Sequence, residues 1–376
     1  MAGQVKSYSP LYLAEQACQS LMRTYSPQEL PPAGKWHYHQ GVFLYGMLKV
    51  WEKTGKQEYF DYVKGYFDYL IDEEGNFVFA RDELDSLQPG MLLFTLYKET
   101  GDRRYKIAAK KLRGLFSTLN RTREGGFWHK DKYPYQMWLD GLFMAGPFAL
   151  MYSYEYHEPE LIDMVLFQEK LMRTHMKDAK TGLLYHAWDE KRETPWSHPV
   201  TGCSPEFWGR SIGWYCAAVV EILDRLPQNH IERRELMESI QNLVKSLIDF
   251  QDQETGLWYQ VVDKGDREDN WLESSCSSLF IYAIAKAIQK EYIDSKYLQA
   301  AQFAYDGLLK HMIAYDTNGN WVMKGICIGT SAGKYDYYVS RATSENDLHG
   351  VGAFVLASTA LQEVIENEGK AGGVLE

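Results

Sequence analysis

The chain has 376 residues, with 40 Lys and Arg against 51 Asp and Glu, which gives a formal net charge of −11. Hydrophobic residues make up 45% and charged residues 24%, a balance that excludes disordered and fibrous proteins. The negative net charge excludes extended binding to nucleic acid or to an acidic membrane, because both require a basic protein surface. Aromatic residues reach 14%, and rings in a concave surface can stack on a flat ligand, although most rings fill the core.

No targeting signal is visible in the sequence. The first seven residues lack the basic start and apolar run of a secretion signal. The longest apolar stretch, residues 141–154, has about 14 residues and contains Pro147, whereas a membrane span needs about 20. The cysteines are odd in number and form no CxxC pair: Cys18, Cys203, Cys216, Cys276 and Cys327. We therefore expect a cytoplasmic protein with reduced thiols and without nucleic-acid or membrane partners, in an oligomeric state that stays open.

The N-terminal part of the chain contains a repeat. Residues 51–59 (WEKTGKQEY) are echoed by residues 97–105 (YKETGDRRY), and the offset between the two glycines is 101 − 55 = 46. In each copy the glycine suits the end of one helix, and a second helix begins near the final tyrosine. That second helix is amphipathic in the first copy, with apolar residues at helical spacing: Phe60, Val63, Phe67 and Leu70.

The same theme continues to the end of the chain. Turns of the form Gly-x-apolar occur at five further positions: Gly75, Gly125, Gly182, Gly256 and Gly319. Very apolar helices are predicted to begin near six polar residues: His39, Asp85, Asp140, Arg210, Glu273 and Asp347. A helix that is apolar on all sides is buried, whereas one apolar stripe marks an outer helix. The sequence contains no alternation of apolar and polar residues long enough to predict a central sheet. We therefore predict an all-α protein, an (α/α)6 toroid, as a single catalytic domain over residues 1–376.

The six polar residues at the helix starts are predicted to lie at one level, at the N-terminal mouth of the toroid. A single Asp at a helix start is more often a capping residue than a ligand-binding one. Six such residues converging among Trp and Tyr side chains favour a ligand site. Carboxylates beside aromatic rings are typical of a sugar site, where rings stack on pyranose faces and carboxylates bind hydroxyl groups.

Three familiar motifs lack the context that they need. Residues 329–333 (GTSAG) match a G-x-S-x-G nucleophile motif, but that motif requires a strand before it and a helix after it in an α/β sheet. We interpret it as a turn. Residues 350–352 (GVG) lack the third glycine of a dinucleotide-binding fingerprint. His37 and His39 are only two residues apart, and there is no HExxH, so no metal site is expected.

Four segments together resemble the unsaturated rhamnogalacturonyl hydrolases of glycoside hydrolase family 105. They are residues 36–41 (WHYHQG), 133–141 (YPYQMWLDG), 204–214 (SPEFWGRSIGW) and 269–275 (DNWLESS), and the resemblance runs from about Leu30 to Leu356. The related unsaturated glucuronyl hydrolases of family 88 share the toroid. The resemblance implies a small anionic oligosaccharide substrate that ends in a 4,5-unsaturated galacturonate, and it implies no metal or organic cofactor.

The implied mechanism is hydration of the C4=C5 bond. Protonation at C4 leaves a cation centred on C5, water adds there, and the resulting hemiketal opens to release the next sugar. One carboxyl group can serve first as acid and then as base, so the usual spacing rule for two carboxylates does not apply. By the resemblance, Asp140 would be the proton donor and Asp85 its partner. A close Asp85 carboxylate would keep Asp140 protonated, while the helix N-terminus would oppose this, and the sequence leaves the balance open.

The resemblance also implies the residues that bind substrate. Three side chains would hold the substrate carboxylate, with the arginine offering a bidentate fork: Arg210, His186 and Lys130. Stacking faces would come from Trp208 and Trp214. Three more residues would complete the site, the first two by hydrogen bonds: Tyr38, His129 and Tyr133.

Three other functions stay open from the sequence. A family 88 enzyme acting on glycosaminoglycan fragments would need clustered basic residues to hold sulfate groups. A sugar epimerase of the N-acylglucosamine type would use two histidines as its acid–base pair, whereas the predicted ring is richer in carboxylates. A non-catalytic carbohydrate-binding protein would need stacking rings but no protonatable pair.

Overall fold

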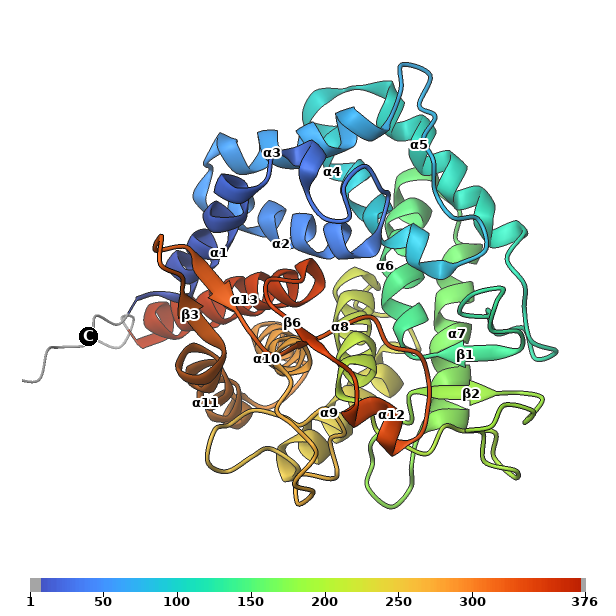
Figure 1. Cartoon of the computed structure of the whole chain (residues 1–376). Helices are drawn as coiled ribbons and strands as arrows, with labels where there is room; N and C mark the ends of the chain where they lie inside the picture. The colour runs from blue at the N-terminus through green and yellow to red at the C-terminus, as the bar shows by residue number, and fades with distance from the viewer. Residues whose placement is uncertain (1–7, 373–376) are drawn as a thin grey trace, which may run out of the picture.

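The fold is a closed double ring of helices (Figure 1). A computed structural model describes residues 8–372, with the side chains of residues 8–367. Six inner helices follow one another around the centre: α2 (Tyr38–Thr54), α4 (Met91–Thr100), α6 (Asp140–Tyr156), α8 (Gly209–Arg225), α10 (Ser274–Gln289) and α13 (Leu348–Gly372). Each inner helix contacts the next, and α13 returns to contact α2. The chain is therefore the predicted (α/α)6 toroid.

Each inner helix has an outer partner. Five of the partners follow their inner helix in sequence: α3 (Gln57–Leu70), α5 (Arg103–Arg113), α7 (Glu160–Met176), α9 (Arg233–Asp249) and α11 (Leu298–Gly307). The sixth is α1 (Pro10–Thr24), which packs against α13 at the other end of the chain. The last hairpin is therefore assembled from the two ends of the sequence.

The inner helices are buried on all sides, as their sequences predict. In α6 every residue from Asp140 to Leu150 is buried, and in α8 every residue from Gly209 to Leu223 is buried. One hydrophobic cluster runs from Leu13 to Val364 through all of the hairpins. The outer helix α3 shows the single buried stripe expected of it, with Phe60, Val63 and Phe67 inside.

The repeated glycines end the helices where the sequence predicts. α2 ends at Thr54 and α4 at Thr100, and the next residues, Gly55 and Gly101, have φ angles of 66° and 70°. This left-handed conformation lets the glycine N–H bond back to the last turn of the helix, and it is costly for a residue with a Cβ. The five predicted Gly-x-apolar turns also have positive φ at their glycine.

One predicted helix start is wrong. Asp85 lies in a 3-10 helix, Leu84–Gly90, and the regular α4 begins only at Met91. Pro89 accounts for the difference, because it has no N–H to donate and its ring clashes with the preceding turn of an α-helix. The tighter 3-10 helix nevertheless brings Asp85 to the same mouth of the ring as the starts of the other inner helices.

Among the described residues, one helix is long and apolar enough to cross a membrane by length and composition, the 348–367 part of α13. It differs from the apolar stretch expected from the sequence, residues 141–154, because polar residues such as Ser358 and Thr359 interrupt it. In the structure 83% of the most apolar window of this helix is buried. The helix packs between α2, α10 and α1, so its apolar surface is covered by protein.

Within residues 8–372, six short strands form three two-stranded antiparallel sheets in the loops. They are β1 (Gln136–Trp138) with β2 (Ala187–Asp189), β3 (Ile313–Tyr315) with β4 (Trp321–Met323), and β5 (Ile326–Cys327) with β6 (Thr343–Ser344). The first pair matters most for the site, because Trp138 lies opposite Ala187 and so brings the two loops together just before α6.

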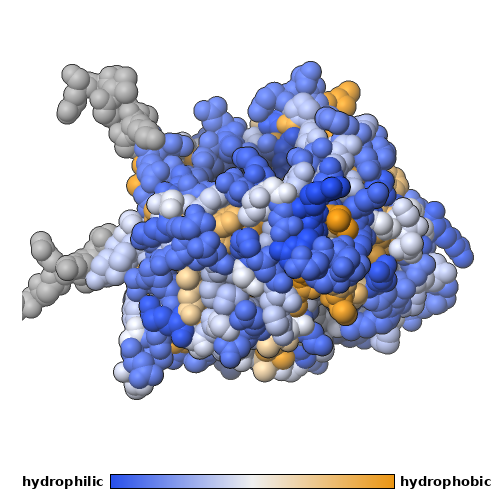
Figure 2. Space-filling model, turned by 90° about the horizontal axis from the view of Figure 1, so that it is seen from above, coloured by the Kyte–Doolittle hydropathy of each residue, from blue (hydrophilic) through white to orange (hydrophobic). Residues whose placement is uncertain are grey.

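The surface seen from above in Figure 2 is mostly hydrophilic, with hydrophobic residues in small separate spots. Isolated hydrophobic residues on a surface are normal. All five cysteines are buried free thiols, which agrees with the structural role predicted for them.

A close approach of two inner helices, α13 and α2, gives a stability test. A Cβ at Gly352 of α13 would lie 2.6 Å from the backbone nitrogen of Phe43 in α2. Since a backbone cannot move aside without shifting the helix, Gly352→Ala should lower the free energy of unfolding by about 2–3 kcal/mol in urea titrations. Gly114→Ala is the matched control, because a Cβ there has no neighbour within 4 Å. Equal stability of the two variants would contradict this packing.

Candidate active site

A cavity of about 340 Å³ lies at the mouth of the ring where the inner helices begin. Four of the six residues predicted to lie at one level line it: His39, Asp85, Asp140 and Arg210. The other two lie outside the lining. Asp347 contacts His39, with 2.9 Å between Oδ1 and Nδ1. Glu273 is buried and caps α10, accepting the backbone N–H of Cys276 at 2.5 Å, so the capping interpretation holds for this residue.

Asp140 is the first residue of α6, and its carboxyl oxygen Oδ2 lies 3.3 Å from Nε2 of His186. The β1–β2 pairing makes this contact, because the backbone N–H of Leu139 donates to the carbonyl of His186. His186 is fully buried and does not line the cavity, so its predicted contact with the substrate stays a prediction. The His186 ring contacts the Asp140 carboxyl group from the protein interior.

The hydrogen bonds of Tyr338 fix the proton on His186. The Tyr338 hydroxyl accepts the backbone N–H of Gly333 at 3.1 Å and lies 2.7 Å from Nδ1 of His186. Burial raises the pKa of Tyr338 well above its ordinary value, so the hydroxyl keeps its proton and donates it to Nδ1. A neutral His186 therefore carries its hydrogen on Nε2, which faces the Asp140 carboxylate.

Asp140 is ionised in this arrangement. Burial would raise its pKa, but the contact with His186, together with His129 and the helix backbone, holds the pKa below its ordinary value of 3.8. The hypothesis that Asp85 keeps Asp140 protonated is therefore not supported. The physical reason is that the Asp85 carboxylate is itself neutralised by a neighbouring lysine.

Asp85 and Lys130 form a partly buried ion pair, with 2.6 Å between Oδ2 and Nζ. Glu83 also contacts Lys130, at 2.8 Å, through the β-bridge between residues 83 and 130. Burial would raise the pKa of Asp85, yet neighbouring positive charge holds it below its ordinary range. Burial lowers the pKa of His129 to about 4, so near pH 7 this positive charge comes from Lys130. Because Lys130 already pairs with the carboxylates of Asp85 and Glu83, its positive charge contributes little to the binding of an anionic substrate.

Arg210, the second residue of α8, is 1% exposed and lines the cavity. Its Nη1 donates to the carbonyl of Cys327 and to Nε2 of His349, the latter at 2.8 Å. Its Nη2 donates to the carbonyl of Ile328 at 2.8 Å. Three of its five N–H donors are thus used, and the Nε–H edge of the guanidinium has no acceptor among the described residues.

The group formed by His39, Asp347 and His349 could geometrically hold a metal ion, since its ligand atoms lie within 4.8 Å of one another. Hydrogen bonding accounts for the arrangement. His349 donates from Nδ1 to Asp347 at 2.9 Å and accepts from Arg210 on Nε2. Burial lowers the pKa of His349 to about 3, with the Arg210 charge adding to the effect, so this histidine is neutral. The Arg210 guanidinium would repel a metal cation bound between these three residues. Their hydrogen bonds orient Arg210 instead.

Two predicted stacking residues are largely hidden. Trp214 is 1% exposed, stacks on Phe143 with ring centroids 5.0 Å apart and does not line the cavity, so its predicted stacking on a substrate stays a prediction. Trp208 lines the cavity but is also 1% exposed, with Arg210 over its ring at 4.6 Å. Apolar inner helices bury their own tryptophans, which a short motif cannot reveal.

A stack of three rings from the loop before α6 lines the cavity. Trp138 stacks between His129 and Tyr133, with 4.5 Å between centroids on both sides. The Tyr133 hydroxyl is 2.8 Å from Oγ of Ser331. Tyr38, the first residue of α2, also lines the cavity, as predicted.

Residues 329–341 form part of the site that the sequence analysis missed. Five residues of this segment line the cavity: Gly329, Thr330, Ser331, Tyr337 and Arg341. The GTSAG motif lies here and is a loop, as predicted, but the loop covers the active-site mouth. Its position was not predictable, because the β5–β6 pairing that frames the segment joins residues about 17 apart without a recognisable hairpin sequence.

A buried carboxylate with a histidine behind it, an arginine and stacked rings in a helical toroid define a carbohydrate-processing enzyme. The sequence model of Glycosyl Hydrolase Family 88 matches residues 13–365. The chain belongs to this family, and it is an unsaturated glycoside hydrolase of the family 88 and family 105 type.

Relatives with known structures or names agree with this assignment. A family 105 glycoside hydrolase from C. acetobutylicum ATCC 824 is 36% identical, with a TM-score of 0.87 over 93% of this chain and 98% of its own. The unsaturated rhamnogalacturonyl hydrolase YesR from Bacillus subtilis is 28% identical over 271 residues, which is 70% of this chain and 73% of the relative. An unsaturated glucuronyl hydrolase from Bacillus sp. GL1, 13% identical with a TM-score of 0.69, shares the fold.

Removing Lys130 tests the buried pair. Lys130→Met leaves Asp85 buried without its partner, so the free energy of unfolding should fall by about 3 kcal/mol at pH 7. In the wild type the lowered pKa of Asp85 gives stability that is present above pH 3.8 and is lost as the pH falls further. Because burial raises the pKa of Asp85 once Lys130 is removed, the deficit of the variant should be largest at neutral pH and should shrink steadily as the pH falls through that raised pKa. Urea titrations between pH 3.5 and about 7 measure it.

Lys132→Met is the control for that experiment, because Lys132 lies in the same cavity but is exposed. A deficit of equal size in both variants, or one that does not change with pH, would show that the Asp85–Lys130 pair does not carry this stability.

Tyr338→Phe tests the assigned tautomer of His186. Without the hydroxyl proton on Nδ1, the preference of His186 for the Nε2–H form should weaken, and both tautomers should be populated. Nitrogen NMR of labelled histidine distinguishes protonated from unprotonated ring nitrogens. An unchanged His186 spectrum in the variant would mean that Tyr338 does not set the tautomer. Tyr337→Phe, in the same short helix α12 (Tyr335–Val339) but without contact to His186, is the control.

Proposed function

We propose that this chain is an unsaturated rhamnogalacturonyl hydrolase. It releases a 4,5-unsaturated galacturonyl residue from short rhamnogalacturonan-derived oligosaccharides by hydrating the C4=C5 bond. The observation that carries the proposal is the Asp140 carboxyl group in the cavity, with Nε2 of His186 3.3 Å from its Oδ2. The 28% identity to the B. subtilis enzyme of that name supports the substrate class.

Asp140 serves as both acid and base in the proposed reaction. Its carboxyl group gives a proton to C4, and the C4=C5 electron pair forms the new C–H bond, which leaves a cation at C5 stabilised by the ring oxygen. Water adds to C5 and returns a proton to Asp140, which restores the acid. The hemiketal then opens, and the bond from C1 to the next sugar breaks as C1 becomes an aldehyde.

The reaction requires Asp140 to be protonated, whereas the pKa of this group in the free protein lies below its ordinary value. Substrate binding changes this balance in two ways. The substrate brings its own carboxylate into the cavity, and it displaces water from around Asp140; both raise the pKa of a carboxyl group. The substrate thus favours the protonated form that attacks its double bond.

Arg210 is the proposed partner of the substrate carboxylate. The bonds to Cys327, Ile328 and His349 occupy one end of the guanidinium and leave the Nε–H and a neighbouring Nη2–H without protein acceptors among the described residues. Two parallel N–H groups fit a carboxylate in bidentate fashion. The His349–Asp347 pair holds the guanidinium in place, so the free edge keeps one direction.

The alternative of a glucuronyl hydrolase for glycosaminoglycan fragments has weaker support. The solved structures with that activity in their titles are 13% and 16% identical and so share only the fold. An epimerase does not fit a member of this hydrolase family.

The test is incubation with an unsaturated rhamnogalacturonan disaccharide while the ultraviolet absorbance of the conjugated double bond is followed. The wild type should remove this absorbance, and Asp140→Asn should lower kcat by about 10³-fold, because a general acid contributes roughly this factor. Asp82→Asn, which changes an exposed carboxyl group, should keep full activity.

Two results would contradict the proposal. Loss of absorbance only with an unsaturated chondroitin disaccharide would assign the glycosaminoglycan substrate instead. Full activity of Asp140→Asn would exclude this residue as the acid.

A further inference from the structure

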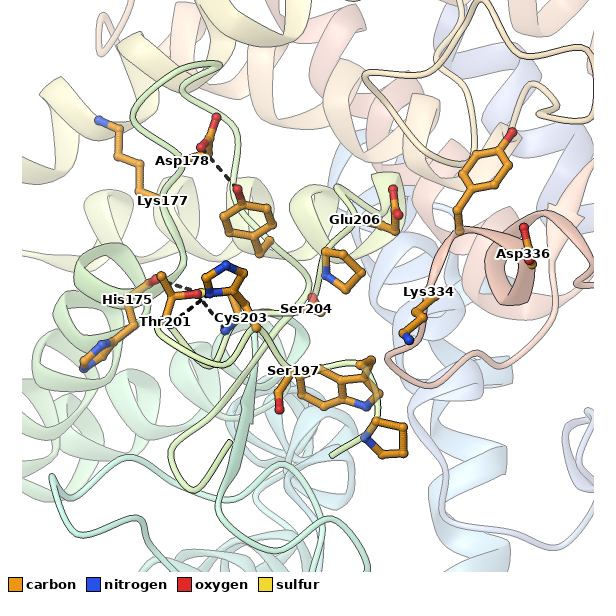
Figure 3. A pocket seen from close by; sticks show the side chains of 16 residues that line it. His175, Lys177, Asp178, Ser197, Thr201, Cys203, Ser204, Glu206, Lys334 and Asp336 are labelled. Carbon is orange, nitrogen blue, oxygen red and sulfur yellow. Dashed lines mark hydrogen bonds between the residues drawn. The ribbon is translucent and has the colours of Figure 1, made fainter. Parts of the chain in front are cut away.

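A second and larger cavity lies beside the active site (Figure 3). Its volume is about 710 Å³, roughly twice that of the active-site cavity and within the range that binds small-molecule ligands. The segment after α7, the loop of residues 195–206 and residues 334–336 form its walls. None of these residues lines the active-site cavity.

The same two chain segments, residues 329–341 and 204–210, contribute to the walls of both cavities. In the segment 329–341, Ser331 and Tyr337 face the active site, whereas Lys334 and Asp336 face the second cavity. Similarly, Ser204 and Glu206 line the second cavity, while Trp208 and Arg210, a few residues further on, line the active site. A ligand in the second cavity therefore lies on the same loop-bearing mouth of the toroid.

Trp196 supplies an aromatic surface in this cavity. It is half-buried, and among the described residues it forms no hydrogen bond and no stack with another ring. The two tyrosine side chains of the lining already have partners in the protein. Tyr185 stacks on Phe207 at 4.6 Å, and the Tyr335 hydroxyl donates to Asp269 at 2.7 Å. Trp196 is thus the ring available to cover the apolar face of a pyranose.

Lys334 supplies the free charge. Figure 3 shows it extending from its segment towards the loop that carries Ser197, whereas Lys177 extends away. Lys334 has no ion pair within the described chain. Of the acidic groups of the lining, Asp178 accepts from Thr181 and Tyr185, Glu206 pairs with Lys264, and Asp336 is exposed. Lys334 is the cation that this lining offers to an anionic ligand.

Polar donors complete the lining. His198 accepts the backbone N–H groups of Val200 and Thr201 on Nδ1, at 3.2 and 3.1 Å, so its ring hydrogen is on Nε2 and is free to donate. Thr201, whose hydroxyl accepts the backbone N–H of Cys203 at 3.3 Å, also lines the cavity. One free ring, one free ammonium group and neutral donors are the groups that recognise an acidic sugar.

We propose that this second cavity binds a uronate-containing saccharide, with Trp196 against a pyranose face and Lys334 paired with a carboxylate. The choice of uronate, rather than another acidic sugar, rests on the proposed function. The cavity holds a stretch of acidic chain beside the site that removes its end residue.

The experiment is calorimetric titration with saturated tetragalacturonate, which has no C4=C5 bond and so is read independently of hydrolysis. Trp196→Ala and Lys334→Gln should each raise Kd by about tenfold, and added salt should weaken binding. Trp196→Phe keeps a ring and should retain most of the affinity, which separates loss of stacking from loss of folding. Lys334 is exposed, so its replacement leaves the packing intact.

Two matched controls locate the ligand. Tyr133→Ala removes a half-buried ring from the active-site cavity, and Lys110→Gln removes an exposed lysine from α5. Both variants should bind tetragalacturonate as the wild type does. A neutral tetrasaccharide, cellotetraose, should bind at least tenfold more weakly than the acidic one.

Three results would overturn the proposal. They are no binding of tetragalacturonate, weakening by Tyr133→Ala but not by the Trp196 and Lys334 variants, and equal affinity for the neutral chain. If the unsaturated disaccharide is not hydrolysed but tetragalacturonate binding depends on Trp196 and Lys334, the proposed function fails and the saccharide cavity stands.

Discussion

Closure of the inner ring is the constraint on which the rest of the structure depends. Helix α13 must return against α2, and the backbones meet so closely at Gly352 that a single methyl group would not fit. Because six apolar helices surround one another, most of their side chains are closed to water. Ionisable groups therefore gather towards the helix ends: at the mouth, where the helices begin and the loops lie, and around Glu221, which pairs with Arg225 and Lys286 towards the ends of α8 and α10. The site is therefore a consequence of how the core is closed.

The mouth brings three buried charged side chains together, and each of them has a partner. Asp85 is balanced by Lys130, and Asp140 is backed by His186. The Arg210 guanidinium is held by carbonyl groups and by a neutral His349. Burial without partners would shift these groups to their neutral forms, so the pairs keep them charged and fixed in direction. Fixed direction is what a site needs to place a proton on one carbon atom of a sugar.

Helical patterns gave the correct architecture for physical reasons that are local. Gly55 and Gly101 end helices because only glycine adopts their conformation without strain, and apolar residues on every side of a helix force it inside. The level of Asp140 and Arg210 followed from the same spacing. Asp85 shows the limit, since one proline replaced the start of an α-helix by a 3-10 helix. The stacking roles given to Trp208 and Trp214 came from motif letters, which carry no information on burial.

The sequence by itself determined the fold class, the six buried helices and four of the ionisable residues in the cavity, because each depends on short-range periodicity or on a single helix end. Only the tertiary structure decided which groups neutralise one another. His186 reaches Asp140 through the β1–β2 pairing, and α1 joins α13 across the whole length of the chain. It also decided that residues 329–341 separate two cavities. These contacts join distant segments through loops, and loop paths follow from packing rather than from any local pattern.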